Sequence, residues 1–393
     1  MQLTKKKPTK GSSFSFKNLA PKKQAASKST SLISLDIGSY ETKMLVGRQM
    51  GDSLIIESAL KEKTTQNACV DGTVSNSSAI AAMLNKMIYQ SNAKTKDLVF
   101  AIESTKIIKR EFVIHKIPDE DIQGLITHEM SQYLPIDIAG YSIQPNVTGS
   151  INDDGAEKIK VSVNAVPKEI MVQYQLLFKS IGLNPVLMVL NSNSIEKLVK
   201  FDIMYNPNSE YKGKNVVFID MGYSCLNVSV YEDGLYQFNR DIEVGGEKLD
   251  SMISERLGIN LDEAQSVKVE IFSQLSAMEL DQKYSSVAPD YLPKNTYDQI
   301  LSNLSAMINQ WAGHIDKVLQ YQIRSRGKNI DKIYLYGGSS LINGISSFFE
   351  SKLAINTGGV GSVSYCKHPP NINPQDLFTI YGNAMGAFIK IGS

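Results

Sequence analysis

Residues 32–40 read LISLDIGSY, and residues 216–224 read VVFIDMGYS. Each stretch is an apolar run of strand character that ends in an aspartate, with a glycine two positions later and a serine close behind. In both copies a second apolar strand, a tight turn of Gly and Asp, and a third strand follow, which predicts a three-strand meander. A unit of this size that recurs at a domain-scale separation predicts two related lobes rather than a short-period repeat.

The turn after each apolar run has the chemistry of a phosphate clamp. Its glycine lets the backbone turn tightly and approach an anion closely. The amides of the turn then point inward as donors, and Ser39 adds a hydroxyl. Asp36, at the end of its strand, is placed to hold a hydrated Mg²⁺ through a water. One such turn indicates little, because many hairpins contain Asp and Gly, but the copy at Asp220 supplies a second clamp from the other lobe.

Two glycine pairs further along the chain strengthen this interpretation. Gly245 and Gly246 follow the second meander and open a helix, so that amides or Lys248 could reach a nucleotide. Residues 334–344, YLYGGSSLING, predict a strand, a diglycine turn and a helix start. Gly337 and Gly338 leave room there for a base and ribose to lie against bare backbone. Each pair alone is an ordinary turn signal, and the information lies in the order of all the motifs.

This order of clamp, clamp and diglycine loop resembles the actin, sugar kinase and Hsp70 ATPase superfamily. The resemblance narrows to the PilM family, which is related to FtsA. The motifs that carry it are DIGS at 36–39 with Lys43, LPID at 134–137, AVPKE at 165–169, LNP at 183–185, GGEKL at 245–249 and ERLG at 255–258. It covers roughly residues 31–390. It implies an α/β, actin-like (ribonuclease H-like), duplicated two-lobe ATPase fold with an inserted FtsA/PilM-type α/β subdomain.

The resemblance also implies a division of the chain. Residues 1–30 form a basic tail that composition predicts to be disordered, and residues 31–103 form the first actin-like subdomain. Residues 104–190 form the inserted α/β subdomain, in which the sequence predicts a helix after Pro118, a hairpin and a second helix that ends at Gly182. The second actin-like subdomain takes residues 191–246 and 331–393. Residues 247–330 form a mainly helical subdomain.

The candidate site residues follow from the clamps and the glycine pairs. We expect ATP and Mg²⁺ as ligands, with Asp36 and Asp220 holding the metal through water. The expected cofactor-binding residues are Asp36, Gly38, Ser39, Tyr40, Lys43, Asp220, Gly222, Tyr223, Ser224, Asn227, Gly245, Gly246, Lys248, Gly337, Gly338 and Ser339.

Catalysis is harder to place. Hydrolases of the superfamily usually carry an acid near the start of the interlobe helix, where it polarises the attacking water. Here that segment begins Asn191, Ser192, and Glu196 comes one turn later. A general base must reach its proton directly or through one water. We therefore expect ATP binding with weak or no turnover, and leave open whether the protein is an enzyme. Asp220 could order the water through the metal, and Glu196 is a weaker candidate.

The family resemblance implies a function in type IV pilus assembly. It implies a cytosolic scaffold that binds the N-terminal cytosolic segment of PilN, a bitopic inner-membrane protein, in a nucleotide-dependent way. Other components of the assembly platform and self-association are further partners to expect. One alternative is an FtsA-like membrane-associated filament protein of cell division or shape. The other is a small-molecule kinase, which would need a catalytic Asp that residues 104–190 do not display.

Composition agrees with a cytosolic protein. The chain has 393 residues, is 42% hydrophobic and 21% charged, and has a formal net charge of +1, which argues against a nucleic-acid-binding surface. Three widely spaced cysteines suit a reducing compartment. Eight lysines precede Asp36 without any acid. This tail is a solvated segment, or a tether to the anionic inner face of the cell membrane, or, less favoured, a nucleic-acid tail.

Overall fold

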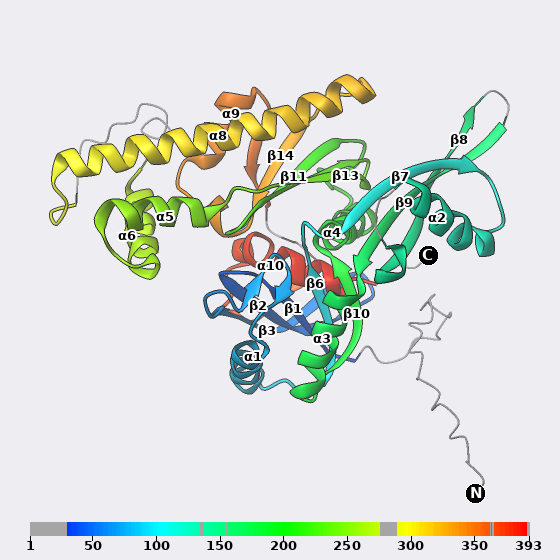
Figure 1. Cartoon of the computed structure of the whole chain (residues 1–393), viewed down its shortest axis with the longest axis horizontal. Coiled ribbons are helices and arrows are strands. Elements are labelled where there is room, and N and C mark those ends of the chain that lie inside the picture. Colours follow the sequence, from blue (N-terminus) through cyan, green and yellow to red (C-terminus); the bar gives the residue numbers. More distant parts are fainter. Residues whose placement is uncertain are drawn as a thin grey trace, which may run out of the picture.

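Two β-sheets, one in each lobe, form the framework of the protein, as the duplicated motif predicts (Figure 1). The computed structural model describes residues 30–133, 137–153, 156–275, 289–361, 363 and 365–390. The first sheet has the spatial order β10 (Asn184–Leu190), β6 (Asp97–Ile102), β1 (Leu32–Ile37), β2 (Glu41–Met50), β3 (Ser53–Lys63) and β16 (Cys366–Lys367). The second has the order β13 (Leu235–Ile242), β12 (Leu226–Glu232), β11 (Asn215–Met221), β14 (Lys332–Tyr336) and β15 (Thr357–Gly359).

Both sheets repeat one strand pattern around the strand that carries the motif. β1 pairs antiparallel with β2 and parallel with β6, and β11 pairs antiparallel with β12 and parallel with β14. The pairs β2–β3 and β12–β13 complete the two predicted meanders. Each motif aspartate therefore lies at the carboxyl end of a central strand, which is where ligand sites of α/β sheets gather.

Helices cover the outer face of each sheet and fill the space between the sheets (Figure 1). The first lobe has α1 (Ser77–Ser91) and α3 (Lys168–Ser180). The second has α5 (Gly246–Leu257), α6 (Leu261–Gln274), α8 (Lys294–Arg326) and α9 (Ile345–Leu353). Between the sheets lie α4 (Asn191–Tyr205) and α10 (Pro374–Phe388), which pack against each other.

Local sequence signals set where several helices begin. The Asn76 side chain accepts the Ala79 amide at the start of α1. At α6, Asn260 and Glu263 form a reciprocal capping box, which satisfies amides that lack a partner within the helix. Asn373 caps α10, whose first position is a proline. These caps fix where α1, α6 and α10 begin, and α10 is the one that lies between the two sheets.

Alternation along the motif strands turns both aspartates toward the same space. Side chains of a strand point alternately to its two faces. On β1, Ile33, Leu35 and Ile37 pack in the outer core of the first lobe, while Ser34 donates to the Ala384 carbonyl of α10. The next residue on that inner face is Asp36.

β11 shows the same alternation in the second lobe. Val217, Ile219 and Met221 pack in the outer core, and Phe218 packs in the core between the sheets. Asp220 follows on that inner face. The apolar strands thus orient their terminal aspartates toward the central helices from opposite sides.

The insert forms a separate small α/β layer beside the two lobes (Figure 1). Its sheet has the order β7 (Ile108–His115), β9 (Ala156–Pro167) and β8 (Tyr141–Asp153), with α2 (Asp119–Tyr133) and the short helix η1 (Ile138–Gly140). It has its own core, made by Ile122, Ile126, Met130, Ile159, Val161, Val163 and Ala165. A hairpin of β4 (Cys69–Val70) and β5 (Thr73–Val74) lies in the first lobe.

Some features of the fold were not predicted. The strands β10, β15 and β16 are absent from the sequence expectations. β16 joins the edge of β3, and α10 contacts β1 and β2 of the first lobe and β14 of the second, so the last part of the chain contacts both lobes. The subdomain boundaries stay a prediction. Residues 1–29 of the basic tail and 134–136 of the LPID motif lie outside the described residues. No helix of the described part has the length and hydropathy needed to cross a membrane.

Candidate functional site

The two motif aspartates meet at one amide on the central helix α10. Asn383 Nδ2 lies 2.9 Å from Asp220 Oδ2 and 3.4 Å from Asp36 Oδ2. The Tyr336 hydroxyl lies 3.3 Å from Asn383 Oδ1 and orients the amide from the other side. Asp36 is only 9% exposed. The structure therefore brings together two carboxylates that are far apart in the sequence and come from opposite lobes.

Burial changes the acidity of this pair. It raises the pKa of Asp220 to about 6, and the charge of Asp36 adds to the rise, while the hydrogen bond from Asn383 opposes it. Two carboxylates held this close in a site with little water repel each other when both are ionised. A divalent cation between them would relieve that repulsion, and oxygen donors are what Mg²⁺ prefers. Among the described residues no cluster of three or more acidic, His or Cys side chains could hold a metal, so water would complete the coordination.

Lys43 supplies a positive charge beside the first clamp. It is the register partner of Asp36 on β2, and its ammonium lies 3.7 Å from where a Cβ on Gly38 would be. Its charge also lowers the pKa of Asp220, which places it at the same site. Among the described residues, no carboxylate lies within 4.0 Å of it. The ammonium is therefore available to an anionic ligand.

The two glycine turns have the same geometry. A Cβ at Gly38 would lie 2.7 Å from the Glu41 carbonyl oxygen, and one at Gly222 would lie 2.8 Å from that of Cys225. Both distances are shorter than real Cβ contacts, so both turns require glycine. The equivalence of the two turns supports the interpretation of the motifs as one duplicated unit.

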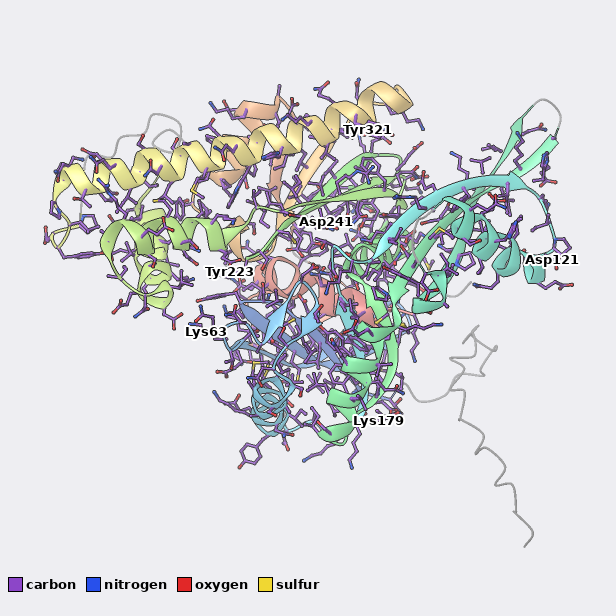
Figure 2. The ribbon with its side chains drawn as sticks, in the orientation of Figure 1. Lys63, Asp121, Lys179, Tyr223, Asp241 and Tyr321 are labelled. Atoms are coloured by element: carbon purple, nitrogen blue, oxygen red, sulfur yellow. The ribbon has the colours of Figure 1, made fainter. Side chains whose placement is uncertain are left out.

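The turns touch each other across the lobes. Ser39 and Ser224 share a hydrogen bond of 2.6 Å, and the rings of Tyr40 and Tyr223 lie 4.8 Å apart. Lys63 of β3 pairs with Asp262 of α6 beside them, and Figure 2 shows Lys63 and Tyr223 facing the same boundary. These contacts close the front of the cleft in this conformation.

The Gly245–Gly246 pair packs on the second turn. A Cβ at Gly245 would lie 2.2 Å from the Tyr223 carbonyl oxygen. The amides of Gly246 and Glu247 donate to the carbonyls of Gly222 and Tyr223. These two amides therefore support the clamp instead of being free for a nucleotide, which was one of the predicted uses. Lys248 is exposed on the first turn of α5.

The diglycine loop abuts Asp220. Gly337 has φ +84°, a left-handed conformation that favours glycine, and a Cβ there would lie 2.3 Å from Asp220 Oδ1. At Gly338 nothing lies within 4 Å of the Cβ position. Ser339 contacts the second clamp, because its hydroxyl lies 3.4 Å from the Gly222 carbonyl oxygen. The short helix η2 (Gly338–Leu341) follows.

Beside this loop lies a buried ion pair that the sequence did not reveal. Lys268 of α6 lies 2.8 Å from Asp250 of α5, which has no exposed surface. The Lys268 ammonium is 3.4 Å from the Cβ position of Gly246. Burial raises the pKa of Asp250, and Lys268 opposes the rise. The pair borders the part of the cleft where Gly246 and Ser339 meet.

Asn227 lies deep in the second lobe rather than at the cleft surface. Its Nδ2 donates to Asp241 Oδ1 at 2.5 Å, and Ser229 donates to its side-chain oxygen at 2.8 Å. Asn227 thereby holds the carboxylate of Asp241 in place. That carboxylate is close enough to Asp220 to raise the pKa of Asp220. Asn227 thus acts on the site through Asp241.

Glu103 approaches from the first lobe. It directly follows β6, and its carboxylate lies 2.8 Å from the Lys109 ammonium, while Oε2 has no partner in the part of the chain that the structure describes. Burial raises the pKa of Glu103 to about 6, Lys109 opposes the rise, and Asp241 adds to it. The carboxylates of Glu103 and Asp241, which belong to different lobes, are therefore close enough to repel each other.

Glu196, the weaker catalytic candidate, has partners of its own. Its carboxylate lies 2.7 Å from the Lys200 ammonium and 3.4 Å from the Tyr236 amide. At the start of α4 stands Asn191, whose buried side-chain oxygen has no hydrogen-bond partner among the described residues. The start of this helix therefore presents the amide of Asn191, and no acid stands on α4 before Glu196.

Comparisons with known proteins agree with this geometry. A family model described as type IV pilus assembly protein PilM matches residues 34–388. The cell division protein FtsA of Porphyromonas gingivalis is 20% identical over 62% of this chain and 54% of its own length. FtsA of Borreliella burgdorferi is 23% identical over 72% and 62%. The chain thus spans 54% and 62% of these two relatives.

Solved structures show the fold. A chain of a PilM-PilN type IV pilus biogenesis complex superposes with a TM-score of 0.74 at 15% identity, over 91% of this chain and 99% of that one. The ethanolamine utilization protein EutJ of Carboxydothermus hydrogenoformans superposes with a TM-score of 0.50 at 12% identity, over 91% and 89%. These likenesses confirm the α/β, duplicated, actin-like fold predicted from the sequence.

Proposed function

Because the chain belongs to the PilM family of type IV pilus assembly proteins, we propose that it is an ATP-binding scaffold of the pilus assembly platform. It would work in the cytoplasm, at the inner face of the cell membrane. The observation that carries ATP binding is the meeting of Asp36 and Asp220 at the Asn383 amide, with Gly337 directly against Asp220. The site takes a triphosphate between the two turns and the base near the diglycine loop.

Magnesium has a place in this proposal. Asp36 and Asp220 would hold the ion through water, and the ion would offset the phosphate charge. Lys43 adds a direct positive contact, because among the described residues its ammonium has no carboxylate partner. The pKa of Asp220, raised to about 6 by burial, still leaves its carboxyl largely ionised at pH 7.

Slow or absent turnover follows from the start of α4. Neither Asn191 nor Ser192 can take a proton from water as a general base. The Glu196 carboxylate is bound to Lys200. ATP would therefore serve mainly as a structural ligand that holds the lobes together.

Nucleotide would control the closure of the lobes. Each lobe contributes one clamp, so a ligand that needs both clamps favours the closed arrangement. The contacts at the front, such as Ser39 with Ser224 and Tyr40 with Tyr223, must separate for a nucleotide to enter. The insert, which continues from β6 and returns through β10, would carry this change to a partner.

We place the PilN-like segment on the first lobe beside the insert. β10 is the edge strand of the six-stranded sheet, and its Val186 and Leu187 are exposed at 37% and 40%. An exposed sheet edge pairs readily with an extended peptide, and exposed apolar side chains give that peptide pockets to fill. Val172 and Leu176 of the preceding helix α3 are also exposed, one turn apart.

The test is a titration of a synthetic N-terminal PilN-like segment by fluorescence anisotropy. We expect its affinity to change when ATP and Mg²⁺ are added to the wild-type protein, and to stay constant in Asp36→Ala. Val186→Lys should weaken binding of the peptide, while Val269→Lys, at a valine of α6 that is 54% exposed, should not. An affinity that ignores nucleotide in the wild type would refute the nucleotide dependence.

A further inference from the structure

A groove lies between the insert and the second lobe. It is distinct from the proposed nucleotide site and from the edge strand β10, where we place the PilN-like segment. It is a cavity of about 330 Å³ between two sheet edges, formed by residues 109–111 of β7 and 236–240 of β13. β7 is the edge of the insert sheet and β13 is the edge of the second-lobe sheet. Ser162 of β9 and Tyr321 of α8 complete the lining, and Figure 2 shows Tyr321 above the region of Asp241, near the end of β13. The volume is within the range of ligand-binding cavities.

The groove contains a buried donor without a partner. Asn239 is 6% exposed and lines the cavity, and its Nδ2 has no hydrogen-bond partner in the described structure. Its side-chain oxygen accepts from the Tyr236 hydroxyl at 3.0 Å. Leaving a buried amide donor without an acceptor destabilises the folded state. The free Nδ2 therefore indicates an acceptor supplied by an occupant.

The charge of the groove indicates an anionic occupant. Arg110 and Arg240 are exposed on the two strands, and among the described residues neither lies within 4.0 Å of a carboxylate. The Arg240 guanidinium instead lies 6.0 Å from the centre of the Phe238 ring. Lys109 is paired with Glu103 at 2.8 Å. Glu111 also lines the groove, so the positive charge sits at two separate points rather than as a continuous field.

We propose that this groove binds an extended, acidic segment of a protein partner, which pairs with a strand edge and places carboxylates against Arg110 and Arg240. Two edge strands offer main-chain hydrogen bonds to such a segment. The basic tail of this chain is an unsuitable occupant, because its lysines would meet two arginines. A nucleic acid is disfavoured, because two isolated cations and a nearby Glu111 make a poor phosphate track.

The occupant would also contact the region behind the nucleotide site. It would bridge the insert, carried by the first lobe, and β13, which carries Asp241 near Asp220. A segment that holds both edges favours one arrangement of the lobes. Its binding is therefore separable from that of a PilN-like segment on β10, and its failure would leave the ATP site untouched.

The test uses an alternating valine–glutamate octapeptide with a fluorescein label, and measures anisotropy with the full chain. We expect saturable binding that weakens about fivefold in the double variant Arg110→Ala/Arg240→Ala, since each exposed charge pair contributes modestly. Arg256→Ala, an exposed arginine on α5, is the matched control and should bind like the wild type. Amide hydrogen exchange should slow in β7 and β13 when the peptide is bound.

Three results would overturn the proposal. The first is no saturable binding of the acidic peptide up to about 1 mM. The second is equal binding of the acidic peptide by the wild type and the double arginine variant. The third is binding of a valine–lysine octapeptide or a twelve-nucleotide poly-dT strand as tight as that of the acidic peptide, which would show a groove without preference for acidic peptides.

Discussion

The carboxylate of Asp220 should destabilise the protein when no nucleotide is bound, and Asp220→Asn should reveal by how much. Burial raises its pKa from 3.8 to about 6, a rise of roughly two units. Each unit corresponds to about 1.4 kcal/mol, so ionisation of this buried group costs about 3 kcal/mol. Asn keeps an oxygen that can accept from Asn383 and removes the charge.

The sign of the pH dependence follows from linkage. The folded state binds the Asp220 proton more tightly than the unfolded chain, so this group stabilises the protein fully only below about pH 3.8. That stability is lost as the pH rises to about 6. Above pH 6 the wild type carries the whole cost, and Asp220→Asn does not. The difference between the two proteins should therefore be near zero at pH 4 and largest at pH 8.

Thermal unfolding without nucleotide, at pH 4, 6 and 8, measures this difference. At pH 8 we expect the unfolding midpoint of Asp220→Asn to be about 4 °C above that of the wild type. Asp52→Asn, at the exposed turn between β2 and β3, is the matched surface control for the loss of one carboxylate. A variant that is less stable than the wild type at pH 8, or a difference that does not change with pH, would refute the reasoning.

Two further predictions concern the glycine loop and the front of the cleft. Gly337→Ala should lower the free energy of unfolding by about 1–3 kcal/mol in urea titrations, because Gly337 has a positive φ and a Cβ there would contact Asp220. Gly338→Ala is the control and should leave the free energy of unfolding nearly unchanged. Equal losses of stability in the two variants would contradict the geometry of the loop. Tyr40→Ala removes a ring contact with Tyr223 worth about 0.5–1.5 kcal/mol and should therefore favour an arrangement in which the lobes are apart. Small-angle scattering without nucleotide should then give a larger radius of gyration. An unchanged radius would show that the contact does not hold the lobes together.

Much of the fold was predictable because the motif strands follow simple rules. Alternation in LISLDIGSY and VVFIDMGYS fixes which side chains are buried, and so which face each aspartate takes. The turn glycines at 38 and 222 also follow from backbone chemistry, and the structure confirms that neither has room for a Cβ. The short strands β15 and β16 escaped prediction because two or three residues carry no periodicity.

The residues that complete the candidate site were harder to find. Asn383 was missed, although a lone asparagine in the apolar helix from Pro374 to Phe388 is a usable signal of a buried polar role. Glu103 directly follows β6, and Asp241 lies near the end of β13. Many exposed acids stand at such positions. Their importance arises from tertiary contacts across the lobes, which no local pattern contains.

Two site predictions changed in meaning when the contacts were known. The amides after Gly245 were expected near a nucleotide, and they instead hold the carbonyls of the second turn. Glu196 was the weaker catalytic candidate, and its carboxylate is held by Lys200. In both cases the residue type at the helix start shows which interactions are possible. The neighbouring residues in the folded protein decide which of these interactions forms.

Isothermal titration calorimetry of ATP tests the central claim most directly. With Mg²⁺, the wild type and Asp52→Asn should each bind about one ATP per chain with equal affinity, and Asp220→Asn should bind at least about tenfold more weakly. Without Mg²⁺ that gap should narrow, because the carboxylate acts through the ion. Absence of ATP binding by the wild type, or equal Mg²⁺-dependent affinity in Asp220→Asn, would contradict a nucleotide held between the two turns.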